Sequence, residues 1–217
     1  MEERTLKEII EDTRKLFMND FSGHDFSHTM RVYRTALELC EREKGNIEIV
    51  SLAALLHDAD DYKLSRKTYE NKNNAVSIMR KYGIEENVIN RVVEIIEQVS
   101  FVGKDSVVPD SIEGKCVQDA DRLDALGAIG IARALTYGGN HNRVLYDPEI
   151  KPRMDMDREE YRNHVSTTIN HFYEKLFLLK DMMNTDSGKR VAVQREMFMR
   201  EYLDEFYREW DGKDISD

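Results

Sequence analysis

Hydrophobic residues recur every three or four positions along most of this chain. Two such stripes open the sequence, over residues 6–17 and 30–40. A helix of about 3.6 residues per turn brings residues with that spacing onto one face, so both stripes predict amphipathic helices. The pattern recurs over about 47–57, 72–82, 86–99, 111–137, 158–184 and 187–210. The sequence therefore predicts an all-α fold.

Prolines and glycines mark where these helices are expected to end. All three prolines, at 109, 148 and 152, lie between the periodic stretches, and Gly138-Gly139 ends the longest stretch. Residues 138–157 are polar, hold two of the prolines and predict a long functional loop. We expect one domain over 1–217, with a helical core (1–137), this loop, and two additional C-terminal helices (158–217) that pack on the core. Their apolar stripe predicts core packing or a homodimer face.

Composition narrows the class of protein. The chain has 217 residues, of which 41% are hydrophobic, enough for a sizeable core. No window approaches the roughly 20 apolar residues of a membrane span, and the amino end lacks the apolar core of a signal peptide, so we expect a cytoplasmic protein without a membrane partner. A net charge of -10 argues against a nucleic-acid polymer as partner. It leaves room for a small anionic substrate, because a local basic pocket or a metal sets the field there.

Polar residues that can hold a metal lie beside the apolar helices. His57-Asp58 ends the apolar run 50–56, His28 stands near the start of an earlier helix, and Asp121 lies in an acidic cluster at 119–124. At about 100° per residue Asp121 and Asp124 share a helix face, whereas Asp119 lies roughly opposite. This favours Asp121 as a ligand, with Asp124 behind it as a carboxylate that orients a histidine.

The type of these ligands indicates the type of metal. Two imidazoles and two carboxylates suit one divalent ion such as Mn, Fe, Co, Ni or Zn, while Mg accepts histidine less readily. Cys40 and Cys116 lie on helical stripes, far from any Cys-x-x-Cys spacing, and are expected to be buried thiols. The sequence therefore predicts a mononuclear site of His28, His57, Asp58 and Asp121.

These residues resemble the H…HD…D pattern of the HD-domain metal-dependent phosphohydrolases. The stretches 23–32 and 119–133, and parts of the carboxyl-terminal helices, are more specifically similar to the small bacterial YpgQ/YedJ-like branch. The four-residue pattern alone is common by chance, whereas the block Asp-Ala-Asp-Arg-Leu-Asp is far more specific. The resemblance covers nearly the whole chain and implies an HD-domain helical bundle with the metal inside it.

The resemblance also implies an activity. In the superfamily the last ligand is the aspartate before an Arg-Leu or Lys-Leu pair, which here is Asp121. The family hydrolyses phosphate esters or anhydrides, and resemblance to this branch implies release of pyrophosphate from nucleoside or deoxynucleoside triphosphates. Among the divalent ions named above, manganese is the expected one. Nucleotide-hydrolysing relatives often carry an acidic residue four positions after the histidine, so Asp61 is the expected general base or water-positioning group, with Asp60 as the alternative.

Phosphate oxygens need cationic partners besides the metal. Lys63 and Arg122 are the nearest candidates by sequence and are expected to act in catalysis, and Arg31 and Arg133 come next, as substrate-binding residues. His24, one turn before His28, is expected to contact phosphate, with helix capping or metal ligation as alternatives. His141, in the long loop, is expected to close over substrate or to be an exposed loop histidine.

Three other readings stay open at this point. A nucleotidase or other phosphomonoesterase would use the same metal and aspartate. Dinuclear iron oxygenases share the HD domain but take extra histidines between the His-Asp pair and the last aspartate, and this chain has none between His57 and His141. A non-catalytic regulatory or scaffold module would keep the metal only as a structural pin.

Overall fold

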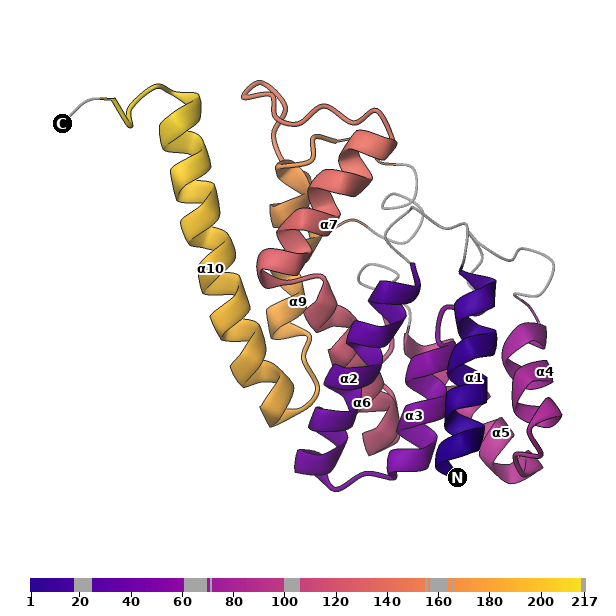
Figure 1. Cartoon of the computed structure of the whole chain (residues 1–217). Helices are drawn as coiled ribbons and strands as arrows, with labels where there is room; N and C mark the ends of the chain where they lie inside the picture. Colours follow the sequence, from indigo (N-terminus) through magenta and orange to yellow (C-terminus); the bar gives the residue numbers. More distant parts are fainter. Residues whose placement is uncertain are drawn as a thin grey trace.

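The computed structural model describes residues 1–17, 25–60, 70, 72–99, 106–154, 156, 164 and 166–215. Within these ranges the chain forms helices and no strands, which confirms the all-α prediction (Figure 1). In chain order the elements are α1 (Glu3–Leu16), α2 (Phe26–Glu43), α3 (Ile47–Leu56), α4 (Asn73–Lys81), α5 (Glu86–Val99), α6 (Ile112–Asp124), α7 (Gly127–Asn140), the π-helical turn η2 (Phe172–Leu176), α9 (Leu178–Asp181) and α10 (Asp186–Trp210).

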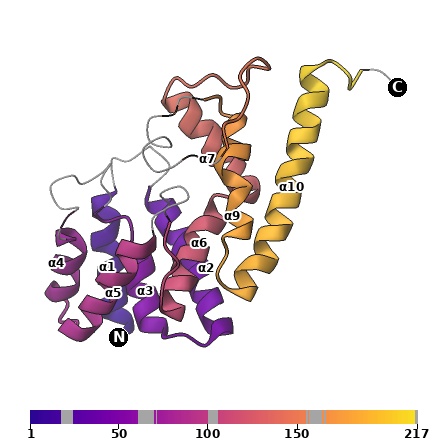
Figure 2. The same ribbon diagram turned by 180° about the vertical axis from the view of Figure 1, so that it is seen from behind.

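The core forms around α3. All of its residues from Ile49 to Leu56 are buried, because the run is apolar on every side. α2 packs against both α3 and α6, and α5 covers α3 and α6 from another side. Figures 1 and 2 show α1 to α5 gathered in one group, with α7, α9 and α10 on the other side of α6. α6 is thus the helix that joins the two groups.

Short polar side chains fix where several helices begin. Asp25 precedes α2 and accepts from the backbone N–H of His28 at 2.7 Å, and Asn46 caps α3 in the same way. Ser111 caps α6 and Thr185 caps α10. Each cap satisfies an N–H that has no partner within its own helix. The cap at Asp25 therefore sets the position of His28 within the first turn of α2.

The predicted single helix over 111–137 is wrong, because it breaks into α6 and α7. Leu126 is extended and Gly127 has φ +71°, a conformation that favours glycine. A Cβ atom at position 127 would also lie only 3.1 Å from Cγ of Arg195. The apolar period continues through this bend, so periodicity alone does not reveal it.

The predicted helix over 158–184 is wrong at the described residues 164 and 166–169, which are not helical, whereas Asn170 is helical. Before it, Thr168 and Ile169 donate their backbone N–H groups to the carbonyls of Val144 and Leu145, at 2.9 and 3.0 Å. Backbone groups paired with the preceding loop cannot form helical hydrogen bonds.

The predicted loop over 138–157 begins three residues later than expected, since α7 continues to Asn140. Its described part is held in place at Tyr146 and Ile150. Tyr146 packs edge-on against Phe206, Tyr207 and Trp210 of α10. Asn170 donates its side-chain amide to the carbonyl of Ile150 at 2.8 Å. No described helix has both the length and the apolar composition needed to cross a bilayer.

Candidate metal centre

Four predicted ligands come together where α2, α3 and α6 meet. His28 lies in the first turn of α2, His57 and Asp58 follow the last residue of α3, and Asp121 lies in α6. His28, His57 and Asp58 are buried and form a group of atoms able to hold a metal ion. The residues are far apart in sequence, so the packing of α2 on α3 and α6 creates the centre.

The distances between the ligand atoms are short and similar. His28 Nε2 lies 3.3 Å from His57 Nε2, 3.4 Å from Asp58 Oδ2 and 3.5 Å from Asp121 Oδ1. His57 Nε2 lies 3.3 Å from Asp58 Oδ2 and 4.0 Å from Asp121 Oδ1. The side chain of Asp121 is 25% exposed and that of His28 is 0% exposed, so the centre opens on the side of Asp121.

Contacts at the other ring nitrogens orient both imidazoles. His57 Nδ1 lies 2.9 Å from the carbonyl oxygen of Ala54, and since a carbonyl only accepts, Nδ1 carries the proton. His28 Nδ1 lies 2.7 Å from Asp124 Oδ2, which fixes its proton in the same way. Each neutral ring then presents the lone pair of Nε2 to the centre. The prediction that Asp124 stands behind Asp121 and orients a histidine is confirmed.

Neighbouring carboxylates outweigh burial in their effect on the pKa of both histidines. Although burial lowers it, the Asp58 and Asp121 carboxylates raise the pKa of His57 to about 9. Burial also lowers the pKa of His28, but Asp124 and Asp58 raise it by more. For Asp124 burial raises the pKa, and the opposite effects of His28 and Arg31 hold it far below its ordinary value. The ion-free centre therefore favours positive charge.

The donor set fits a divalent metal. A cation with bonds of about 2.1 Å at tetrahedral or octahedral angles separates its ligand atoms by roughly 3.0–3.4 Å. Most of the separations found here lie at or just above that range. Two lone pairs and two carboxylates that face one another are the arrangement that a cation stabilises. Histidine nitrogens with carboxylates suit first-row transition ions better than Mg²⁺.

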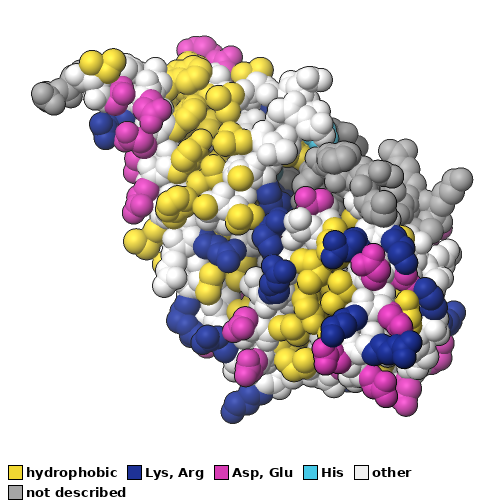
Figure 3. Space-filling model, in the orientation of Figure 1, with side chains coloured by type: hydrophobic (Ala, Val, Ile, Leu, Met, Phe, Trp, Pro, Cys, Tyr) yellow, Lys and Arg dark blue, Asp and Glu magenta, His cyan; other side chains and the backbone are white. Residues whose placement is uncertain are grey.

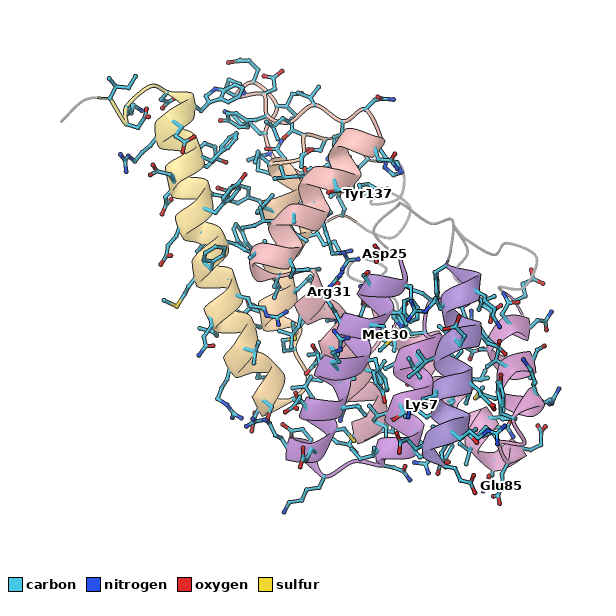
Figure 4. The ribbon with its side chains drawn as sticks, in the orientation of Figure 1. Lys7, Asp25, Met30, Arg31, Glu85 and Tyr137 are labelled. Carbon is cyan, nitrogen blue, oxygen red and sulfur yellow. The ribbon has the colours of Figure 1, made fainter. Side chains whose placement is uncertain are left out.

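Arg31 and Arg133, predicted to bind substrate, both contact Asp124. Arg31 donates Nε to Oδ1 at 2.7 Å and Nη2 to Oδ2 at 3.0 Å, and Arg133 donates Nη1 to Oδ2 at 2.8 Å. Figure 4 shows Arg31 on α2 and Tyr137 on α7 near the junction of the two helix groups. In this structure both arginines donate to the Asp124 carboxylate, which in turn contacts Nδ1 of His28. Their contact with substrate stays a prediction.

Arg122, predicted to act in catalysis, is a buried residue of α6. Its Nη1 donates to the carbonyl of Met182, and its Nε forms no hydrogen bond with the described residues. Burial lowers the pKa of its guanidinium, while Asp119 and Asp121 act in the other direction. The proposed contact of Arg122 with phosphate is untested.

Asp60, the alternative to Asp61, has another partner in this structure. Both of its carboxylate oxygens accept backbone N–H groups at the start of α4, from Asn74 at 3.1 Å and Ala75 at 2.9 Å. Lys72 occupies the N-cap position of α4, but its side chain does not cap the helix. The carboxylate of Asp60 instead acts as the helix cap of α4 in this structure. Asp61, Lys63 and His24 lie outside the described residues.

His141 lies at the end of α7. It is exposed, its ring stacks on Tyr137 with centroids 3.9 Å apart, and its Nδ1 donates to the Tyr137 carbonyl at 2.9 Å. Arg143 approaches the same tyrosine ring at 5.7 Å. The predicted closure of His141 over substrate stays a prediction.

Sequence reasoning missed Lys175. This half-buried lysine of η2 interacts electrostatically with the ligand Asp121, although it lies more than fifty positions away in the chain. Its local sequence resembles any amphipathic helix, so no pattern distinguished it from a surface lysine.

Comparisons with known proteins agree with this geometry. The HD-domain family model matches residues 25–126, which contain all four ligands. YpgQ of Bacillus subtilis strain 168 is 36% identical over 203 residues, covering 93% of this chain and 91% of that protein. Its crystal structure in complex with ADP has a TM-score of 0.76 and 34% identity, with 94% of this chain and 97% of that chain covered.

Two further crystal structures are similar over almost the whole chain. A protein from Lactobacillus plantarum has a TM-score of 0.86 and 38% identity, covering 98% of this chain and 99% of that one. An HD-superfamily hydrolase from Bacillus thuringiensis has a TM-score of 0.74 and 38% identity, covering 96% and 97%. Fold and site thus define an HD-domain protein of the metal-dependent hydrolase superfamily. Within it, this chain belongs to the family of YpgQ and its structural neighbours, as the resemblance predicted.

Proposed function

We propose that this protein hydrolyses the phosphate chain of nucleotides, with one divalent ion, manganese, held by His28, His57, Asp58 and Asp121. The observation that carries the proposal is the convergence of two histidine nitrogens and two carboxylates at 3.3–4.0 Å. When bound there, such an ion would act as a Lewis acid on a phosphate oxygen and lower the pKa of water.

The remaining chemistry is assigned to side chains of this chain. Asp124 keeps the His28 proton on Nδ1, and the Ala54 carbonyl does the same for His57, so both rings stay neutral ligands. Asp61 directs the attacking water and takes its proton, since Asp60 is engaged in capping α4. Lys63 and Arg122 stabilise the negative charge that develops on the phosphate oxygens.

For the substrate we propose a nucleoside or deoxynucleoside triphosphate, cleaved to the monophosphate and pyrophosphate. The binding of ADP by YpgQ, a relative 36% identical in sequence, supports a nucleotide. The alternative is a nucleotidase or other phosphomonoesterase, which would place a terminal phosphorus beside the water instead of the α-phosphorus.

The test is a panel of nucleoside tri-, di- and monophosphates and simple phosphate esters, incubated with Mn²⁺ and analysed for phosphate and pyrophosphate. We expect pyrophosphate and monophosphate in equal amounts from triphosphates, and little release from monophosphates. Asp58→Ala should lower turnover by at least about 10³-fold, the scale on which one electrostatic group in an active site acts. The exposed Asp110→Ala serves as the control and should keep its turnover.

Two results would overturn the proposal. Phosphate as the sole product would identify a phosphomonoesterase at the same site. Stabilisation by Mn²⁺ without turnover of any compound would identify a module in which the metal is only a structural pin.

A further inference from the structure

Helix α10 lies at the margin of the molecule, and its two sides differ. Its inner side is buried at Ala192, Met199 and Leu203. Figures 1 and 2 show no described helix beyond its outer side. The exposed residues within about 40° of Met197, on a helix of 3.6 residues per turn, form what we call the outer face: Asp186, Arg190, Val193, Met197, Glu201, Asp204 and Arg208.

The middle of the outer face is apolar. Val193 and Met197 are 46% and 58% exposed, and Phe198 at its flank is 48% exposed. Large apolar side chains that water reaches lower the free energy when a partner covers them. An apolar centre with charged residues around it is the usual anatomy of a protein–protein interface.

The charged residues of α10 are sorted along its length. Lys189 and Arg190 lie before the apolar middle, whereas Glu201, Asp204 and Glu205 lie after it. The helix dipole does not explain this order, because it favours acidic residues near the start of a helix and basic residues near its end. Figure 3 shows the same order along the left edge of the molecule, with dark-blue side chains below, yellow ones in the middle and magenta ones above. Each half of the exposed helix is therefore complementary in charge to the other half.

A second copy of the chain can use this complementarity twice. When two copies of α10 lie antiparallel about a two-fold axis at Met197, each residue faces the residue equally far from Met197 in the opposite direction. Three pairs of opposite charge then face each other, and each forms twice: Asp186 with Arg208, Lys189 with Glu205, and Arg190 with Asp204. Glu201 faces the apolar Val193, so no residue of the outer face opposes one of like charge.

The charged side chains can exchange their present contacts at little cost. In the described chain these contacts lie within α10 itself: Lys189 Nζ with Asp186 Oδ1 at 3.9 Å, Arg190 Nη2 with Ser187 Oγ at 3.0 Å, and Arg208 Nη1 with Glu205 Oε2 at 2.9 Å. The two ion pairs among them are exposed to solvent, so they add little to stability. Opposite charges on a partner are less screened where the interface excludes water.

The order of the charges favours a second copy over an unrelated protein, since an unrelated partner requires no symmetry about Met197. α10 has 25 residues, so the contact can extend over about 37 Å. One helix from each copy makes a small interface, of the class below about 1,200 Å² that forms weak complexes, and we expect a dissociation constant of about 1–100 µM.

We propose that the outer face of α10 binds a second copy of this chain, in an antiparallel and two-fold symmetric dimer centred on Met197. The apolar middle supplies the buried area, and the charged pairs set the register of the two helices. The inference does not depend on the proposed function, because no residue of the outer face belongs to the candidate metal centre.

The first test is a charge exchange, measured by analytical ultracentrifugation of the full chain at about 1–500 µM, which spans the expected dissociation constant. One variant carries Lys189→Glu and Arg190→Glu, and the other carries Asp204→Lys and Glu205→Lys. Each variant alone opposes like charges twice, so we expect its self-association to weaken by at least about 100-fold. An equimolar mixture restores opposite charges at every pair, and it should form a heterodimer with about the affinity of the wild type.

The matched control reverses two exposed charges on α1, Arg4→Glu with Lys7→Glu, and should dimerise like the wild type. A wild type that stays monomeric over the whole range would overturn the proposal and leave the outer face to another partner or to solvent. Dimerisation that survives in both charge-reversed variants would also overturn it, because the interface would then lie elsewhere. Thermal midpoints show whether each variant folds.

The second test needs no charged variant and reports the register directly. In the proposed dimer Met197 faces its own copy, so Met197→Cys should form a disulfide between two chains under mild oxidation. Val193→Cys is the control, because its two copies lie about 12 Å apart along the helices, beyond the reach of a disulfide. The native Cys40 and Cys116 are buried and should stay unlinked. Equal cross-linking of both variants, or of neither, would contradict an axis at Met197.

Discussion

Asp124 links the metal centre to its surroundings through a single carboxylate. It contacts Nδ1 of His28 at 2.7 Å and accepts hydrogen bonds from Arg31 and Arg133, and it is 5% exposed. An asparagine of the same shape would lose the negative charge that keeps the His28 proton on Nδ1 and leave two arginines facing an amide. The orientation of His28, a predicted metal ligand, thus depends on a residue that is not itself a predicted ligand.

We expect Asp124→Asn to weaken Mn²⁺ binding by about 10–100-fold, the usual effect of removing such an orienting partner. Calorimetric titration of the ion-free protein measures this. Asp181→Asn, an exposed position on α9, is the matched control. Unchanged Mn²⁺ affinity in folded Asp124→Asn would show that His28 is oriented by other contacts.

Residue types and helix-face spacing singled out four side chains that the structure brings together, and they also indicated the place of Asp124 behind Asp121. Asp121 and Asp124, three positions apart, share a face whatever the tertiary structure. The pairing of Asp124 with Arg31 joins residues 93 positions apart, and it depends on how α2 meets α6. Lys175 was missed for the same reason. Long-range packing decides such contacts, and no local pattern in the sequence encodes it.

Among the helices, α1 is tied to α4 mainly by polar contacts at Asp12. This carboxylate accepts from Lys15 Nζ at 2.9 Å, from Tyr82 Oη at 2.9 Å and from Lys81 Nζ. Hydrogen bonds from Lys81, Lys15 and Tyr82 hold the pKa of Asp12 well below its ordinary value of 3.8. A depressed pKa in the folded state adds stability above the unfolded-state value, and that stability is lost as the pH falls through the folded-state value.

Asp12→Asn should therefore lower the free energy of unfolding by about 0.5–1 kcal/mol between pH 5 and 8, a modest figure because both lysines are more than half exposed. The deficit relative to wild type should shrink as the pH falls below about 4, where the unfolded carboxyl is protonated. Urea denaturation at several pH values measures it, with Glu8→Gln on the same helix as control. A deficit independent of pH down to pH 2 would contradict the assigned cause.

α10 is fastened to α6 by Asp119, the aspartate that the helix-face argument set apart from the metal. Its two oxygens accept from the backbone and side chain of Asn184 and Thr185, at 2.7–2.9 Å. Thr185 in turn caps α10 through Gly188 N at 2.9 Å, and a Cβ at Gly188 would lie 2.5 Å from Asp119 Oδ2. The buried carboxylate thus holds the capping residue of α10 against α6.

Asp119→Asn should cost about 2–3 kcal/mol, because an amide offers one acceptor and turns donors toward other donors. Amide hydrogen exchange should speed up first in the initial turns of α10, before α2 or α3 are affected. Exposed Asp110→Asn provides the control. Uniform loss of protection across all helices would show that Asp119 supports the global fold instead of this one junction.

Element boundaries show where periodicity misleads. The apolar period runs without interruption from α6 into α7, yet the backbone bends at Gly127 because φ is positive there and Arg195 packs against it. Likewise the stretch before Asn170 keeps a helical period but pairs its backbone with residues 144 and 145. In both places a tertiary contact overrides local propensity. By contrast, α3, α4 and α5 begin and end within one or two residues of their predicted limits.

At the scale of the molecule, α2, α3 and α6 bring the four predicted ligands together. α10 packs against α2, α6 and α7, and two of these helices, α2 and α6, carry residues of the candidate site. Since ligands come from three helices that pack only in the folded chain, metal binding and folding are coupled. Mn²⁺ should therefore raise the thermal midpoint, and above the dissociation constant the stabilisation should grow with the logarithm of the Mn²⁺ concentration.

The central claim is that His28, His57, Asp58 and Asp121 together hold one divalent ion. Crystals grown with Mn²⁺ and measured on both sides of the manganese absorption edge test it most directly. The account predicts one anomalous peak per chain, within about 2.0–2.3 Å of an atom from each of the four side chains. A peak bound by other residues, two peaks in this centre, or no peak in crystals of active protein would contradict it.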